Sequence, residues 1–258
     1  IEGLTMIAAI MQPTFLPWIG YFDLIDQSDI FVFLDSVQFE KQSWQQRNRV
    51  RSPSGLDWLT VPVYIKGRFG QTIGEVEIKT DTFPDKLLKT LKQHYSKCDY
   101  FSEYWQELES ILLCAKQNKN LADLNISLIR WLADLLGISS QFVLASNLKV
   151  EDSRSHRLVN ILKSINADSY LSPRGSMEYL IHDRQIFVNA ELPIMFQSFT
   201  QPIYKQRYAP FESGASAIDI LFNEGASFTA ELMRLGRQLP ESLDDVIERN
   251  KEMFNVYK

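Results

Sequence analysis

The segment Ile7–Ile25 constrains the fold of this chain more than any other. Residues 7–11 form an unbroken apolar run, which predicts a buried strand, and the run stops at Gln12-Pro13. Apolar residues at helical spacing follow, and a second apolar run occupies residues 29–34. A strand, a helix and a strand in so short a segment predict a βαβ unit, with parallel strands and a right-handed crossover.

The rest of the chain predicts an α/β protein, a Rossmann-like parallel sheet with a helical insertion. Leucines and aromatic residues recur at helical spacing through the insertion, and short apolar runs resume after it. The expected parts are the N-terminal half of the core at 6–82, the helical insertion at 83–137, the C-terminal half of the core at 138–225 and a helical tail at 226–258.

Several shorter segments are assigned from their local composition. Residues 40–56 are polar and basic, and the part around Trp44–Arg49 is expected to be a loop. A strand is expected at 58–64, where Pro62 predicts an edge strand or an early end. Further strands are expected at 75–79, 186–189 and 193–199.

Composition and charge exclude several classes of protein. The chain has 258 residues, enough for a full core, and its net charge of −5 argues against a general nucleic-acid surface. No apolar run reaches the ~18–20 residues that a membrane-spanning helix needs. Cys98 and Cys114 are too few for a disulfide framework, so a reducing cytoplasm fits best. The three histidines lack metal-ligand spacing, and no metal site is expected.

The turn after the first strand holds the first group of candidate site residues. Ligands bind beyond the carboxyl ends of parallel strands, where Gln12 is expected to lie. The turn lacks the glycine-rich patterns of dinucleotide and P-loop sites, but Pro13 and Pro17 stiffen it. Gly20 permits close backbone approach, and the helix N-terminus beside it suits a phosphate or carboxylate. The alternative is a rigid structural turn in which Trp18 serves only packing.

A basic and aromatic cluster follows the second expected strand. Arginine suits bidentate capture of phosphate or carboxylate, tryptophan offers a stacking face, and asparagine and glutamine reach sugar hydroxyls or base edges. The alternative is an ordinary solvated loop. The candidates in this cluster are Asp35, Gln38, Trp44, Arg47, Asn48 and Arg49.

Two further candidate groups lie in the C-terminal half of the chain. Arg174 follows a strand expected at 168–172 and is placed to close on an anion at the same edge of the sheet, unless its segment is an ordinary turn. Tyr204 and Gln206 precede an apolar helix that carries Asp219. The alternative role of Asp219 is an internal cap or salt bridge.

Together these motifs resemble the WbqC-like family over most of the chain. The resemblance implies a bacterial protein of surface-polysaccharide and O-antigen gene clusters, where the family is linked to the decoration of amino sugars. It implies a cytoplasmic transferase that forms an amide between an acyl or aminoacyl donor and a nucleotide-linked amino sugar. The matching segments are 12–22, 34–39, 44–49, 58–62 and 216–225.

The resemblance and the expected strand ends together suggest roles for the candidates. Asp35 is the expected general base, and Gln12 and Tyr21 complete the expected catalytic group. The expected partners are the nucleotide-linked amino sugar and a small acyl or amino-acid donor, without nucleic acid, and a homodimer is left open. The expected substrate-binding residues are Pro13, Trp18, Gly20, Gln38, Trp44, Arg47, Asn48, Arg49, Arg174, Tyr204 and Gln206.

A weaker resemblance reaches the pantothenate synthetase-like adenylating enzymes. Their turn after the first strand carries a His-x-Gly-His motif, and Trp18-Ile-Gly-Tyr21 occupies that place here without either histidine. This resemblance implies an alternative function, the activation of a carboxylate with ATP and magnesium as cofactors. The missing histidines and the lack of an evident nucleophile leave a third hypothesis, a non-catalytic nucleotide-sugar-binding protein of the same pathway.

Overall fold

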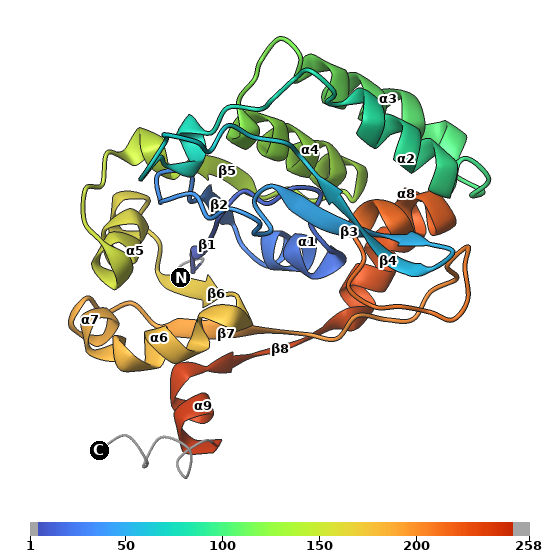
Figure 1. The fold of residues 1–258 in the computed structure, drawn as a ribbon. Coiled ribbons are helices and arrows are strands. Elements are labelled where there is room, and N and C mark those ends of the chain that lie inside the picture. The colour runs from blue at the N-terminus through green and yellow to red at the C-terminus, as the bar shows by residue number, and fades with distance from the viewer. Residues whose placement is uncertain (1–4, 250–258) are drawn as a thin grey trace.

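A computed structural model describes residues 5–249 as an α/β fold around a six-stranded sheet (Figure 1). The strand order is β5-β2-β1-β6-β7-β8, in which β8 runs antiparallel to β7 and the other neighbours pair in parallel. This Rossmann-like sheet confirms the expected fold class. The strands are β1 (Ile7–Met11), β2 (Ile30–Phe33), β3 (Arg47–Ser52), β4 (Gly55–Thr60), β5 (Gln141–Leu144), β6 (Ser169–Ser172), β7 (Ile194–Phe199) and β8 (Arg237–Ser242). The helices are α1 (Ile19–Asp26), α2 (Asp85–Tyr95), α3 (Phe101–Cys114), α4 (Leu121–Leu135), α5 (Arg154–Ser164), α6 (Met177–His182), α7 (Arg184–Asn189), α8 (Ala217–Gly236) and α9 (Leu243–Arg249).

Strand β1 lies in the middle of the sheet because both of its faces are apolar. Ala9 packs in a hydrophobic cluster with α1 to α4 and α8, whereas Ala8 and Ile10 pack in a cluster with α5, α6, α7 and α9. Strand β1 pairs with β2 on one edge and with β6 on the other. The strand order therefore reverses between β1 and β6, and such a switch point is where sheets of this type bind ligands.

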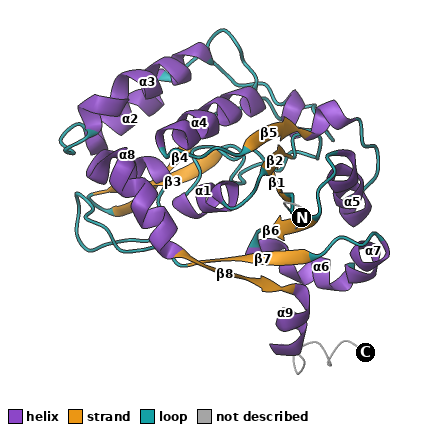
Figure 2. Ribbon diagram, turned by 180° about the vertical axis from the view of Figure 1, so that it is seen from behind, coloured by secondary structure: helices purple, strands orange, loops and turns teal. Residues whose placement is uncertain are grey.

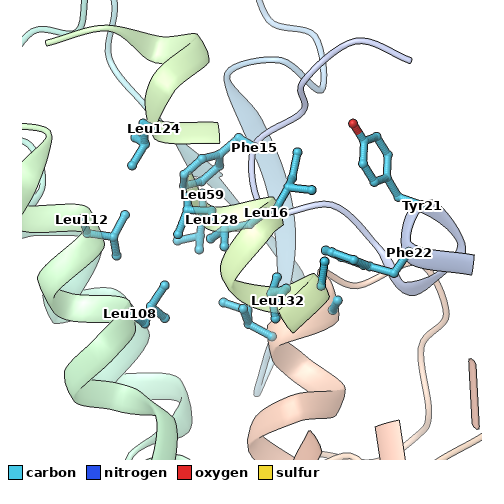
Figure 3. Packing of buried hydrophobic residues seen from close by; sticks show 14 of the residues in the cluster. Phe15, Leu16, Tyr21, Phe22, Leu59, Leu108, Leu112, Leu124, Leu128 and Leu132 are labelled. Carbon is cyan, nitrogen blue, oxygen red and sulfur yellow. The ribbon is translucent and has the colours of Figure 1, made fainter. Parts of the chain in front are cut away.

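Helices α2, α3 and α4 fill the expected insertion and pack on the core. Figure 3 shows Leu108 and Leu112 of α3 directed at α4 and at residues of the β1–α1 turn. Asn125 on α4 also fastens two loops, because its side-chain amide donates to the main-chain oxygens of Pro13 at 3.0 Å and Gln45 at 2.7 Å. The insertion therefore supports the turn that follows β1.

The basic segment after β2 is partly a hairpin. Strands β3 and β4 pair antiparallel and form a sheet of their own (Figure 2). The expectation of a loop around Trp44–Arg49 is therefore wrong from Arg47 onward. Buried Asn48 and Val50 alternate with charged residues, so the sequence does have the two-residue period of a strand. The prediction of a loop followed the high charge of the segment instead. Strand β4 ends before Pro62, which confirms the early end.

Three other secondary-structure predictions are wrong. Residues 75–79 do not form a strand. They make only isolated bridges, each of a single residue pair. Residues 186–189 lie in the helix α7, since a short apolar run fits either structure. The tail expected to be helical at 226–258 contains β8, which has no apolar alternation and forms through backbone pairing with β7. The part of that tail after residue 249 lies outside the described residues.

Candidate functional site

A cleft lies at the carboxyl ends of β1, β6 and β7, at the switch point of the sheet. Its larger part, called the main lobe, has a volume of about 610 Å³, and Gln12, Arg174 and Phe199 line it. A second part, called the small lobe, has a volume of about 290 Å³ and extends to Arg49 and Gly214. The two lobes form one continuous site because they share several lining residues. These are Met11, Thr14, Trp18, Tyr21 and Trp44.

The β1–α1 turn presents Thr14 and Trp18 to the cleft by burying the residues between them. Phe15 and Leu16 are fully buried, and the Phe15 N–H donates to the Trp44 carbonyl at 2.9 Å. Leu16 has a φ of 42°, a left-handed conformation that strains a residue with a side chain. The turn leaves the buried Thr14 hydroxyl in the lining of both lobes, without a hydrogen-bond partner among residues 5–249. A buried hydroxyl without a partner costs stability, and this one lies in a residue of the cleft lining.

Gly20 is a glycine because the indole of Trp18 lies on it. A Cβ atom at this position would meet the Trp18 ring at 2.3 Å, so the indole would have to move. The same indole meets Phe199 edge to face, with ring centroids 5.5 Å apart. The close approach expected at Gly20 is therefore made by Trp18, and both residues still line the main lobe.

Gln12 and Tyr21 are joined by hydrogen bonds at the end of β1. The Tyr21 hydroxyl donates to the Gln12 carbonyl at 2.9 Å, and the Gln45 amide donates to Gln12 Oε1 at 2.9 Å. Gln12 Nε2 therefore keeps its two donors for another partner. Burial raises the pKa of Tyr21 well above its usual value, so its phenol stays neutral in the physiological range.

Tryptophans and arginines form a stacked group at the rim of the small lobe. Trp44 and Trp58 each expose 47% of their surface, and their ring centroids lie 5.3 Å apart. The Arg47 guanidinium lies 4.2 Å from the Trp58 ring centre, and that of Arg49 lies 5.5 Å from the Trp44 ring centre. Trp44 and Arg49 line the small lobe, whereas Arg47 and Trp58 do not. Asn48 also lines it.

Asp35, Gln38 and Pro13 lie near the cleft but do not line it. The Asp35 carboxylate accepts hydrogen bonds from the Ser146 N–H at 2.9 Å and from the Ser146 hydroxyl at 2.6 Å. Gln38 is exposed and makes an isolated bridge with Thr72. The carbonyl of Pro13 accepts the bond from α4 described above. Asp35 therefore holds the start of the 3₁₀ turn that follows β5.

Tyr204 and Gln206 belong to a separate buried group around Asp219. The Asp219 carboxylate accepts hydrogen bonds from the Tyr204 hydroxyl at 2.5 Å, the Tyr95 hydroxyl at 2.7 Å and the Gln206 amide at 3.0 Å. The Tyr95 hydroxyl in turn accepts the Arg51 N–H at 2.9 Å. Burial raises the pKa of Asp219, and these hydrogen bonds oppose the rise. This geometry fits an internal anchor, and neither Tyr204 nor Gln206 lines the cleft.

Sequence reasoning missed several groups of the main lobe. Glu40 is the one carboxylate residue in the lining of either lobe, and its carboxylate has no ion-pair or hydrogen-bond partner in the described part of the chain. The sequence signal that could have indicated Glu40 was its position just after Phe39, beyond the end of an expected strand. Tyr179 follows the same expected strand as Arg174 but was not singled out, and Gln197 lies inside an expected strand, away from its end. Thr14 was visible only as part of the turn.

Among residues 5–249, no group of three or more His, Cys, Asp and Glu side chains is placed to hold a metal ion. Over the same range, no helix is long and apolar enough to cross a membrane.

Comparison with known proteins gives a family and a relative. The sequence profile of the WbqC-like protein family matches residues 12–230, which include most of the cleft lining. A protein of Mycobacterium tuberculosis (strain ATCC 25618 / H37Rv), named Uncharacterized protein Rv1507c, is 34% identical over 231 residues. The match covers 89% of this chain and 98% of that protein. No solved structure matches the chain.

Proposed function

The chain belongs to the WbqC-like protein family, and from the geometry of its cleft we propose that it is a transferase that forms an amide on a nucleotide-linked amino sugar. The observation that carries the proposal is the two-lobed cleft at the switch point of the sheet. The small lobe has aromatic walls, and the main lobe has one cation, Arg174, and one carboxylate, Glu40. Taken together, the lobes of about 610 and 290 Å³ fall in the range of small-molecule sites, about 300–1,000 Å³.

The nucleotide base occupies the small lobe in this proposal. Trp18 and Trp44 provide the stacking faces, and the Arg49 guanidinium is held by the Gly214 carbonyl at 3.4 Å, where it faces the base edge. The diphosphate and the sugar then extend into the main lobe. Arg174 meets the diphosphate there, since its distance of 3.8 Å from Glu241 leaves the guanidinium free to turn.

The chemical step joins the sugar amine to the activated carbonyl of an acyl or aminoacyl donor. The amine nitrogen attacks the carbonyl carbon, a C–N bond forms, and the bond from that carbon to the leaving group breaks. The leaving group takes the electron pair. The Glu40 carboxylate accepts the amine proton, because Asp35 is engaged with Ser146. Gln12 Nε2 donates to the oxygen on which negative charge develops.

The pathway assignment follows the family resemblance. A product of this type would enter the synthesis of O-antigen or another surface polysaccharide, and nucleotide-linked sugars for such polymers are cytoplasmic intermediates. The coupling of an acyl group changes the sugar amine from cationic to neutral, whereas an aminoacyl group brings a cationic amine of its own. With an acyl donor we therefore expect the enzyme to alter the charge of a surface polymer.

A calorimetric titration tests the binding part of the proposal. Wild-type protein is expected to bind a UDP-linked amino sugar, and Arg174→Ala is expected to weaken it about 10- to 100-fold through loss of a charge-assisted hydrogen bond. Trp44→Ala should weaken UDP-sugar and free uridine alike, whereas Arg174→Ala should leave uridine binding unchanged. Arg130→Ala removes an exposed arginine that stacks on Phe142 far from the lining, and serves as control.

A product assay tests the transfer step. Mass spectrometry of the nucleotide sugar after incubation with activated acyl and aminoacyl donors should show the mass of the amide. Glu40→Gln should lower kcat at least about 100-fold with little change in the dissociation constant of the nucleotide sugar. Binding without turnover on any donor would favour a carrier or scaffold role. Pyrophosphate release from ATP, magnesium and a carboxylic acid would favour adenylation instead.

A further inference from the structure

A third cavity opens beside the main lobe, on the side away from the small lobe. It has a volume of about 450 Å³, and we call it the basic lobe. Leu34, Leu158 and Tyr179 line both it and the main lobe, so the two are contiguous. Its remaining lining residues are Val37, Arg154, Arg157, His182 and Asp183.

The basic lobe carries two guanidinium groups without a carboxylate partner among the described residues. Arg157 is oriented by main-chain oxygens, since its Nε donates to Asp152 at 2.5 Å and its Nη1 to Ser36 at 3.4 Å. Arg154 is exposed and makes no ion pair with any acidic residue among 5–249. The one carboxylate in the lining, Asp183, accepts a hydrogen bond from the Ser155 hydroxyl at 2.5 Å. The local balance of charge therefore favours an anion.

The backbone adds to this preference. Helix α5 has 11 residues and begins at Arg154, and the side chain of its N-cap residue, Ser153, makes no capping hydrogen bond. The first N–H groups and the positive end of the helix dipole thus lie at the basic lobe. Arg154 lines the basic lobe at the start of this helix. Its φ of 50° is a left-handed conformation that is rare for a residue of its size.

The floor of the basic lobe is apolar. Leu34, Val37 and Leu158 come from the end of β2 and from α5, and they offer a surface for a carbon chain. No tryptophan lines this cavity, so it lacks the paired indoles of the small lobe, although Tyr179 and His182 belong to its lining. A ligand that fits has a short apolar arm and a strongly anionic head.

We propose that the basic lobe binds the second substrate, an acyl donor whose activating group carries phosphate. This inference rests on the proposed function, because it assigns the donor side of the same reaction. The phosphate binds Arg154 and Arg157, and the acyl arm crosses Leu158 and Tyr179 into the main lobe, where the sugar amine waits. The two substrates then occupy the cleft together, and the reaction passes through a ternary complex without an acyl-enzyme.

The test uses inorganic pyrophosphate as the anion probe, titrated into protein already saturated with the UDP-linked amino sugar. Pyrophosphate is expected to bind without displacing the sugar nucleotide. The variant Arg154→Ala/Arg157→Ala should weaken pyrophosphate at least tenfold and leave the dissociation constant of the sugar nucleotide within about twofold. Lys163→Ala, an exposed change at the far end of α5, should alter neither.

The outcomes separate this inference from the proposed function. If pyrophosphate competes with the sugar nucleotide, or binds the double variant as well as wild type, the basic lobe is not a separate anion site and the inference is overturned. If the UDP-linked amino sugar itself fails to bind wild type, the proposed function fails. In that case the pyrophosphate titration into free protein still decides whether Arg154 and Arg157 form an anion site.

Discussion

The cleft and the buried group around Asp219 are built from the same kinds of side chain but differ in hydrogen bonding. Each contains tyrosine, glutamine, an arginine and a carboxylate, and both were candidate sites from the sequence. Around Asp219 three donors converge on one carboxylate that is 0% exposed. In the cleft the Thr14 hydroxyl and the Glu40 carboxylate have no partners among residues 5–249.

This difference indicates what each cluster does. A closed group of hydrogen bonds stabilises the folded state and has no capacity left for a ligand. Unpaired polar groups in a cavity lower stability and gain partners only when a ligand arrives. We therefore assign the Asp219 group to stability and the cleft to binding, although residue types alone do not distinguish them.

The largest expected effect comes from removing the shared acceptor. Asp219→Ala leaves the buried hydroxyls of Tyr95 and Tyr204 without an acceptor, and should lower the free energy of unfolding by about 3–5 kcal/mol. Urea unfolding measures the change. Glu40→Ala, which removes a carboxylate without partners, should change the same quantity by less than about 0.5 kcal/mol. A stable Asp219→Ala protein that no longer binds the sugar nucleotide would reverse the two assignments.

A matched pair of tyrosine variants comes next. Tyr204→Phe removes a 2.5 Å bond to a carboxylate and should cost about 1.5–3 kcal/mol of stability without changing ligand affinity. Tyr21→Phe removes a 2.9 Å bond to a neutral carbonyl and should cost about 1 kcal/mol. Only Tyr21→Phe should weaken the sugar nucleotide, by about two- to fivefold, because Tyr21 fixes Gln12. Equal effects on affinity would remove the distinction between the clusters.

Thr14→Val probes an unsatisfied group directly. The change keeps the shape and removes a buried hydroxyl without a partner, so stability should stay constant or rise by up to about 1 kcal/mol. Affinity for the sugar nucleotide should fall about fivefold. Thr229→Val is the matched control, since that hydroxyl donates to the Gly225 carbonyl at 2.6 Å, and it should lose about 1 kcal/mol and keep its affinity. A destabilised Thr14→Val protein would mean that its hydroxyl has a partner.

The smallest expected effect is on stability at acid pH and comes from a partly exposed ion pair. Burial raises the pKa of Asp26, but hydrogen bonds from Arg234 and Arg237 lower it more, so the folded pKa lies below the unfolded one. This contribution is fully present above the unfolded pKa, near 4, and is lost as the pH falls through the folded value. Asp26→Asn should therefore cost about 0.5–1 kcal/mol at pH 7 and progressively less as the pH falls below about 4, measured by urea unfolding. If wild type and Asp26→Asn differed in stability by the same amount at every pH, the predicted lowering of the Asp26 pKa would be wrong.

The sequence predicts the fold well where the signal is local. The apolar runs of β1 and β2 and the helical spacing of α1 decide their structures through side-chain burial, so periodicity finds them. Strand β8 forms by backbone pairing with β7 across the chain, and its sequence carries no matching pattern.

The candidate site divides in the same way. Gln12, Trp18 and Arg174 were found because strand ends of a parallel sheet meet at one edge. Arg47 and Arg49 looked equivalent in the sequence, but only Arg49 lines the small lobe, whereas Arg47 stacks on the Trp58 ring. Likewise, Tyr204 and Gln206 were assigned to substrate because a sequence does not show which donors Asp219 already holds.

The most direct test of the central claim is hydrogen exchange of the whole protein with and without a saturating UDP-linked amino sugar. The account predicts slower exchange on binding at residues 12–21, 40–49 and 173–179, which line the cleft, and no change at 85–95 and 217–223, which belong to the Asp219 group. Protection confined to 85–95 and 217–223 would contradict the account, because the ligand would then bind where the hydrogen bonds are already satisfied.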